Sequence, residues 1–163
     1  MITNGTLLDA GLLALLSQVR LSYVIVSLNA ATRDTFLSIT GRDMFDRVVE
    51  NLRTWARFGR EHPVGSFRVY SSFVVMRSNF RELPQFIRLA QDLGTEIQLL
   101  HVIGDRGGED IFVRQDQHKA LHNILAEADE VAIGTTREQV TRIRRILSAH
   151  RIEAGAAMTA GFR

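Results

Sequence analysis

Six polar residues stand at, or directly after, the ends of the short apolar runs that predict β-strands. They are Asn4, Ser27, Asn29, Arg77, Asn79 and His101. If the strands are parallel, their carboxyl ends meet along one edge of the sheet, and α/β folds bind their ligands at that edge. The Arg77 guanidinium also offers a planar fork of donors that suits a carboxylate. The sequence therefore predicts a ligand-binding mouth at these strand ends.

The same residues also have structural explanations. Ser27 and Asn29 could cap the helix that follows their strand, and Asn4 precedes Gly5, a common turn pair. Arg77 could be a solvated turn residue. A histidine at the end of an apolar strand, such as His101, is more often buried and hydrogen-bonded than bound to a ligand. Both explanations stay open at this point.

Metal and thiol chemistry find little support. The 163 residues include no cysteine, which excludes disulfides, thiolate nucleophiles, cysteine-bound zinc and an iron–sulfur cluster held by this chain. His118 and His122 have the four-residue spacing of a helical metal pair, but no acidic residue completes a known motif with them. We therefore predict no metal site and assign no catalytic residue.

The charge balance does not point to nucleic acid or membrane partners. The formal net charge is only +2, which is too small to indicate a nucleic-acid surface. No run approaches the ~20 apolar residues that span a bilayer, and the N-terminus lacks the layout of a signal peptide, so we expect a cytoplasmic protein. We interpret the basic last helix as a solvated face; its arginines are Arg137, Arg142, Arg144, Arg145 and Arg151.

Strand-like and helix-like segments alternate along most of the chain. The predicted strands are 2–3, 23–26, 67–75 and 96–103, and strand–helix repeats imply a parallel sheet with right-handed crossovers. The continuous apolar run 23–26 is typical of a strand covered on both faces. From residue 116 the pattern is helical only. We predict an α/β fold, an incomplete parallel (β/α) barrel of about four strands with covering helices, plus a C-terminal helical segment.

Five segments, in this order and at this spacing, resemble the radical S-adenosylmethionine enzymes. Residues 2–8 resemble the family's third strand and its turn, 26–32 the fourth strand with its Ser-Leu-Asn, and 45–52 the helix after it. Residues 74–79 resemble the fifth strand and its exit, and 97–102 the sixth strand. The resemblance divides the chain into a partial barrel, 1–113, and helices packed on the same domain, 114–163.

In that family the cofactor lies across the carboxyl end of a partial barrel of six strands. The resemblance implies that Ser27 contacts the ribose of S-adenosylmethionine and that Arg77 pairs with its carboxylate. The other residues of the mouth would be two further cofactor-binding residues, Asn29 and Asn4, and two substrate-facing residues, His101 and Asn79.

The departures from the family are as informative. The family's CxxxCxxC loop holds a four-iron four-sulfur cluster, and its second strand carries a Gly-Gly-Glu motif, but both are absent here. Residues 107–109 read Gly-Gly-Glu but follow the segment that resembles the sixth strand, so we interpret this match as chance. The cluster is thus implied only in a full-length relative, and S-adenosylmethionine binding should be weak or absent. We expect a truncated or partial chain without radical chemistry of its own, so whether it is an enzyme stays open.

Two alternatives remain. The strand at Ile2 would leave an exposed edge, which a homodimer or a missing N-terminal half could cover, so the chain could be a non-catalytic binding or assembly module. A weaker alternative is a phosphate-binding barrel that uses the loop from Gly104 to Gly108. The sequence does not identify a small-molecule or peptide substrate.

Overall fold

The computed structural model describes the chain except residues 17, 20, 62–66, 105–106 and 161–163, and describes only the backbone of 151–160. Four parallel strands form one sheet in chain order. The sheet does not close, which confirms the predicted incomplete α/β barrel. Its strands are β1 (Ile2–Thr3), β2 (Tyr23–Ser27), β3 (Arg68–Val75) and β4 (Glu96–His101).

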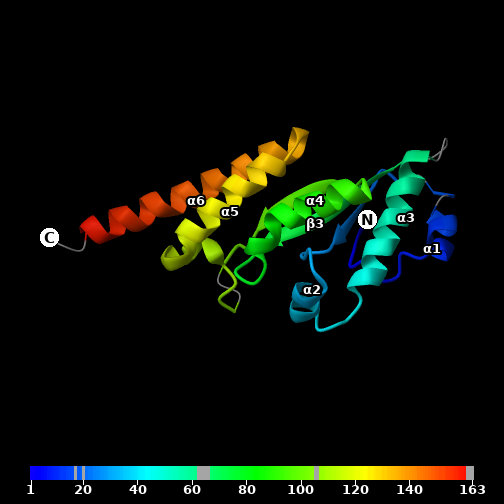
Figure 1. Ribbon diagram of the computed structural model, residues 1–163, viewed down its shortest axis with the longest axis horizontal. Coiled ribbons are helices and arrows are strands. Elements are labelled where there is room, and N and C mark those ends of the chain that lie inside the picture. Colours follow the sequence, from blue (N-terminus) through cyan, green and yellow to red (C-terminus); the bar gives the residue numbers. More distant parts are fainter. Residues whose placement is uncertain (17, 20, 62–66, 105–106, 161–163) are drawn as a thin grey trace.

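Helices alternate with the strands and then follow them. Figure 1 shows the order along the long axis, with α1 and α3 at one end of the molecule and α5 and α6 at the other. The helices are α1 (Ala10–Leu16), α2 (Arg33–Thr40), α3 (Phe45–Glu61), α4 (Leu83–Leu93), α5 (His118–Val131) and α6 (Gly134–Ala160). Short 3-10 turns occupy Phe80–Glu82, Ile111–Val113 and Gln115–Gln117.

Helix ends follow local sequence signals. The Thr32 hydroxyl accepts a hydrogen bond from the Thr35 N–H and so caps the start of α2. Pro84 lies in the first turn of α4, where its missing N–H costs nothing. Gly94 ends α4 in the left-handed conformation, φ 68°, which glycine adopts readily at the C-cap of a helix.

One face of the sheet is fully covered. Val24, Val26 and Phe73 alternate with less buried neighbours and are inaccessible to solvent. They lie on the face that α3 and α4 cover, where Trp55 and Phe86 are also completely buried. The rings of Phe73 and Phe86 pack with their centroids 4.6 Å apart. This face therefore carries the main core.

The opposite face, which would form the inside of a closed barrel, is much less covered. Tyr23 is 46% exposed and Leu100 38%, and Ile25, Tyr70 and Gln98 are half-buried. The expectation that the run 23–26 is covered on both faces is therefore wrong for Tyr23, because none of the described strands and loops covers its side chain in this open sheet.

The first edge of the sheet is a short, exposed strand. Ile2 is 72% exposed. The Ile25 N–H donates to the Met1 carbonyl at 2.9 Å, so the Ile2 peptide groups face away from β2, because neighbouring residues of a strand direct these groups to opposite sides. Further exposed apolar side chains are concentrated in the first 23 residues: Leu7, Leu15, Val19 and Tyr23.

Two side chains of α3 hold the segment after β1. The Asn51 amide donates to the Gly5 carbonyl at 2.9 Å, and the Trp55 indole N–H donates to the Leu8 carbonyl at 2.8 Å. Both bonds satisfy backbone acceptors in a stretch without regular structure. The β1 edge is thus anchored to the core from inside.

The two C-terminal helices pack together at the β4 end. Leu121 and Leu125 of α5 and Val140 and Ile143 of α6 are completely buried. Figure 1 shows α5 and α6 side by side, with the last turns of α6 extending beyond the rest. Within the part of the chain that the structure describes, no helix is both long and apolar enough to cross a membrane.

Candidate functional site at the carboxyl ends of the strands

The parallel order brings the six predicted residues to one edge of the sheet. Ser27 pairs with Ser72 in the β2–β3 register, and His101 pairs with Val75 in the β3–β4 register. Arg77 follows β3 by two residues, at the same edge. The six residues thus lie at one edge, where the mouth is predicted. That they contact a ligand there stays a prediction.

Asn29 fixes the exit of β2 against the exit of β3. Its N–H donates to the Ser72 carbonyl at 3.1 Å, and its Oδ1 accepts from the Val74 N–H at 2.9 Å. The backbone of Asn29 is left-handed, φ 56°, a conformation that asparagine tolerates better than most residues. Its side-chain NH₂ has no acceptor among the described residues.

Asn79 completes the same connection from the other side. It is only 1% exposed. Its Nδ2 donates to the carbonyls of Asn29 and Val74, both at 2.9 Å, and its Oδ1 accepts from the Met76 N–H at 2.8 Å. Every polar atom of this side chain is thus bonded to backbone, so the geometry favours a positioning role over substrate contact.

Glu82 is a functional candidate that the sequence did not single out. Its carboxylate accepts from the N–H groups of Ala31 at 2.7 Å and Thr32 at 3.3 Å. It also accepts from the hydroxyls of Thr32 and Thr35. A carboxylate is favoured at a helix N-terminus, here that of α2. The only local signal was two threonines three residues apart at that helix start.

Asn79 and Glu82 both hydrogen-bond to the β2–α2 loop. Some polar side chains around this loop have no partner in the described part of the chain. Among the described residues, the half-buried Ser27 hydroxyl and the exposed Arg77 guanidinium have no hydrogen-bond or ion-pair partner. The Arg77 N–H donates to the Glu109 carbonyl at 2.9 Å, which anchors its backbone. The free groups of the mouth among the described residues therefore include the Ser27 hydroxyl, the Asn29 NH₂ and the Arg77 guanidinium.

Asn4 and His101 flank this group. Asn4 is exposed, and its Oδ1 accepts from the N–H and the hydroxyl of Thr6, at 3.1 and 2.9 Å, which is ordinary turn geometry. His101 is half-buried and meets the Phe112 ring edge to face, with centroids 5.7 Å apart. Both side chains border the mouth, and each already has one interaction: Asn4 through its Oδ1 and His101 through its ring.

The free groups suit a polar organic ligand better than a metal. A hydroxyl, an amide NH₂ and a guanidinium can bind ribose hydroxyls and a carboxylate, as S-adenosylmethionine presents. No three histidine, aspartate or glutamate side chains of the described part gather as metal ligands. His118 is buried, with its Nε2 2.6 Å from the Phe112 carbonyl, whereas His122 is exposed. Without cysteine, the chain does not fit an iron–sulfur cluster.

The loop from Gly104 to Gly108 lies partly outside the described residues, since 105 and 106 are not among them. Gly104, Gly107 and Gly108 all have positive φ, between 64° and 83°. The Glu109 carboxylate accepts from the Ser78 N–H at 2.9 Å. This carboxylate would repel phosphate, whereas the Arg114 guanidinium, which lies against Gly108, would attract it, so the described residues do not decide the phosphate-binding alternative.

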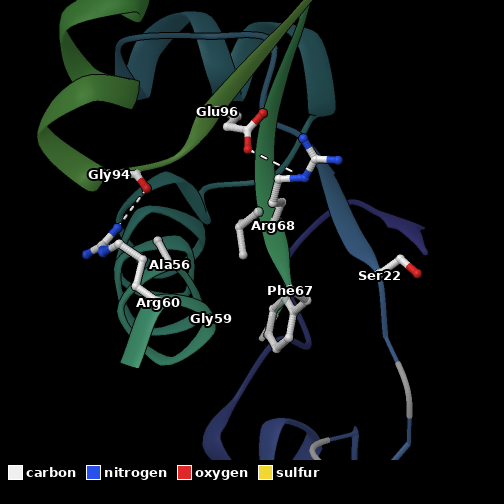
Figure 2. A pocket seen from close by; sticks show the side chains of 9 residues that line it. Ser22, Ala56, Gly59, Arg60, Phe67, Arg68, Gly94 and Glu96 are labelled. Atoms are coloured by element: carbon white, nitrogen blue, oxygen red, sulfur yellow. Dashed lines mark hydrogen bonds and ion pairs between the residues drawn. The ribbon is translucent and has the colours of Figure 1, made fainter. Parts of the chain in front are cut away.

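A hollow lies at the opposite end of the sheet. Figure 2 shows its lining side chains at the amino ends of β3 and β4. The volume of the hollow is about 630 Å³. Its charged side chains already have partners, because Arg60 donates to the Gly94 carbonyl at 2.7 Å and Arg68 lies 3.7 Å from the Glu96 carboxylate. Burial raises the pKa of the nearby Tyr70 phenol, and Glu96 raises it further. Among the described residues, Arg60 bonds only to the neutral Gly94 carbonyl and has no carboxylate partner, so the hollow keeps one unpaired positive charge.

The comparison with known proteins agrees with the sequence motifs. No family model matches the chain. A protein of Saccharolobus solfataricus named "Probable GTP 3',8-cyclase" is 43% identical over 107 residues, which is 64% of this chain and 32% of that protein. A protein of the same name from Sulfurisphaera tokodaii is 31% identical over 137 residues, 82% of this chain and 41% of that one.

The chain thus spans between a third and two-fifths of the length of these relatives. GTP 3',8-cyclases are radical S-adenosylmethionine enzymes. The predicted resemblance is therefore confirmed, and this chain is a homologue of a segment of the radical S-adenosylmethionine enzymes.

Proposed function

We propose that this chain forms the S-adenosylmethionine-facing part of a radical S-adenosylmethionine barrel. The observation that carries the proposal is the pair of side chains Asn79 and Glu82, which hold the β2–α2 loop through backbone groups. This fixed loop leaves the Ser27 hydroxyl and the Asn29 NH₂ without a partner among the described residues, at the same edge of the sheet as Arg77. A preorganised set of free donors is what a polar cofactor needs.

Each free group has a proposed partner on the cofactor. The Ser27 hydroxyl binds the ribose, with the Asn29 NH₂ beside it, and the Arg77 guanidinium pairs with the carboxylate. Asn4 lines the same mouth. His101 and Asn79 are the predicted substrate-facing residues; of the two, His101 needs the smaller rearrangement, because the Asn79 amide is fully bonded to backbone.

The chain by itself would carry out no radical chemistry. Bound to a reduced four-iron four-sulfur cluster, S-adenosylmethionine supplies a radical by reductive cleavage, and this sequence has no cysteine to hold that cluster. Its own residues would bind and orient the cofactor. The relatives' name specifies GTP, so a purine nucleotide is the first substrate to test with any cluster-bearing partner.

The β1 edge is the proposed place for such a partner. The outward peptide groups of Ile2 would hydrogen-bond to a further parallel strand. The Ile2 side chain, which is 72% exposed, would pack against that strand. A second copy of the chain is the rival occupant. We also infer that residues 114–163 belong to the same domain as 1–113, supported by the hydrogen bonds of α6 to β4. A cytoplasmic location stays a prediction.

The test is S-adenosylmethionine binding to the isolated chain, by isothermal titration or NMR shifts. Without a cluster to hold the amino acid part we expect weak binding, which Arg77→Ala and Ser27→Ala each reduce by about tenfold, as expected for one charge-assisted or well-placed hydrogen bond. The matched controls are Arg88→Ala and Ser38→Ala, exposed positions on α4 and α2, which should leave the affinity unchanged. Equal losses in controls and test variants would refute the assignment.

The alternative, a non-catalytic assembly module, is favoured by the open β1 edge alone. It predicts no S-adenosylmethionine binding in any variant. It also predicts a stable dimer or complex in sedimentation velocity that Ile2→Lys disrupts. Cofactor binding by a chain that stays monomeric would exclude it.

A further inference from the structure

The outer edge of β4 is bonded by side chains of α6. The Leu99 N–H donates to the Gln139 Oε1 at 2.7 Å, and the Gln139 Nε2 donates to the Ile97 carbonyl at 2.8 Å. One turn further along α6, the Arg142 guanidinium donates to the Leu99 carbonyl. The polar groups that β4 turns away from β3 at Ile97 and Leu99 are thus largely satisfied.

The Gln139 amide takes the place of a peptide group. A neighbouring strand would offer β4 one carbonyl and one N–H, and the Gln139 side chain offers the same acceptor and donor from a helix. Residues three apart lie on the same side of a helix, which lets Arg142 continue the contact. A row of two side chains therefore occupies the positions that a fifth strand would need.

Other residues keep α6 in place. Val140 and Ile143 are completely buried and Leu147 nearly so, and all three face the core. The helix would stay docked through these apolar contacts if Gln139 and Arg142 lost their hydrogen bonds. Changing the two polar side chains therefore tests whether they, and not the bulk of the docked helix, keep another strand away from β4.

We propose that Gln139 and Arg142 of α6 block strand addition at β4, so that the sheet can be extended only at β1. This goes beyond the proposed function, because it concerns the outer side of β4 and not the carboxyl ends of the strands. The partner they exclude is the β4 strand of a second copy. Unpaired strand edges invite such pairing, and identical edges can pair across a two-fold axis.

The experiment compares Gln139→Leu with Arg142→Met, made together, against wild type. Both replacements keep side-chain size and remove the hydrogen bonds. In sedimentation velocity across a concentration series, self-association should strengthen by about tenfold or more, and in dilute NMR samples the Leu99 amide should exchange about tenfold faster. The control pair is Thr135→Leu with Arg145→Met, exposed positions of the same helix that cause the same charge change; it should behave as wild type.

A second variant keeps the test decisive if the double variant misfolds. Gln139→Glu retains the acceptor for the Leu99 N–H and places a carboxylate against the Ile97 carbonyl, so it should increase self-association less than the double variant does. The proposal is overturned if folded variants remain as monomeric as wild type, or if the Leu99 amide exchanges at its wild-type rate.

Discussion

The two edges of this sheet are treated in opposite ways. At β4, the Gln139 and Arg142 side chains bond the outward backbone of Ile97 and Leu99. At β1, Ile2 is 72% exposed, and no described residue bonds to its outer side. An edge strand with free peptide groups pairs readily with another strand. The comparison favours our proposals that β4 is closed to further strands and that β1 is the edge where a partner would pair.

The difference also shows how each edge is held. The β4 edge is gripped from outside by a helix, whereas the segment after β1 is held from inside by Trp55 and Asn51 of α3. Changes at α3 and α6 should therefore loosen different edges. Four predictions follow from this division, beginning with the largest effect.

Trp55→Ala should lower the free energy of unfolding by about 3–5 kcal/mol, because a completely buried indole is lost and a cavity remains. Hydrogen exchange should quicken at the Ile25 amide, which bonds to Met1, before it quickens at Leu99. Trp55→Phe, which loses mainly the bond to the Leu8 carbonyl, should cost about 1–2 kcal/mol.

The matched variant for the other edge is Ile143→Ala in α6. It removes a completely buried side chain at the β4 end and should quicken exchange at Leu99 before Ile25. Chemical denaturation gives the size of each effect, and NMR exchange gives its location. If both variants quicken exchange at Ile25 and Leu99 equally, the two edges unfold as one cooperative unit, and they are not held independently.

Gly5→Ala should destabilise the β1 edge by about 1–3 kcal/mol, because both strain and a clash act there. Gly5 has φ 79°, and an added Cβ would lie 2.7 Å from a Val26 methyl. Gly41→Ala is the control, since Gly41 has φ 68° with open space around it. Urea denaturation should show the larger loss for Gly5; equal losses would mean that Val26 moves aside at no cost.

Ile2→Lys should change the free energy of unfolding by less than about 0.5 kcal/mol, as for most exposed positions, yet abolish any strand pairing at β1. A charged side chain on an edge strand opposes such pairing. Ile103→Lys is the control, because Ile103 is 80% exposed beyond the other edge. If sedimentation shows that both variants associate as wild type does, β1 is not an interface.

Tyr70→Phe tests the uncovered face between the edges through pH. Burial raises the pKa of the Tyr70 phenol, so its neutral form stabilises the fold below the ordinary pKa of about 10, and this contribution is lost as pH rises through the higher folded pKa. The variant should lose less stability than wild type between about pH 9 and 11. If urea denaturation shows that wild type and Tyr70→Phe lose the same stability over this pH range, the raised pKa of Tyr70 is contradicted.

Much of the fold was predictable because its signals are local. Apolar runs with β-branched residues marked β2, β3 and β4, and Gly94 marked the end of α4. Repeated strand–helix order implied parallel strands, and parallel strands placed Ser27 and Arg77 at one edge. These inferences need only neighbouring residues and the handedness of crossovers, so the sequence by itself determined the α/β class, the order of the strands and the family resemblance.

Only the tertiary structure decided which of these residues are already occupied and which edge is covered. Asn79 and Glu82 each bond to a residue 50 positions earlier in the sequence, and Gln139 bonds to a residue of β4 that is 40 positions earlier. No local pattern marks such pairs, because an asparagine, glutamate or glutamine reads as an ordinary polar residue until its partner is known. Tyr23 lies in an apolar run yet stays exposed for the same reason: burial depends on elements that cover a face, and those elements are distant in the sequence.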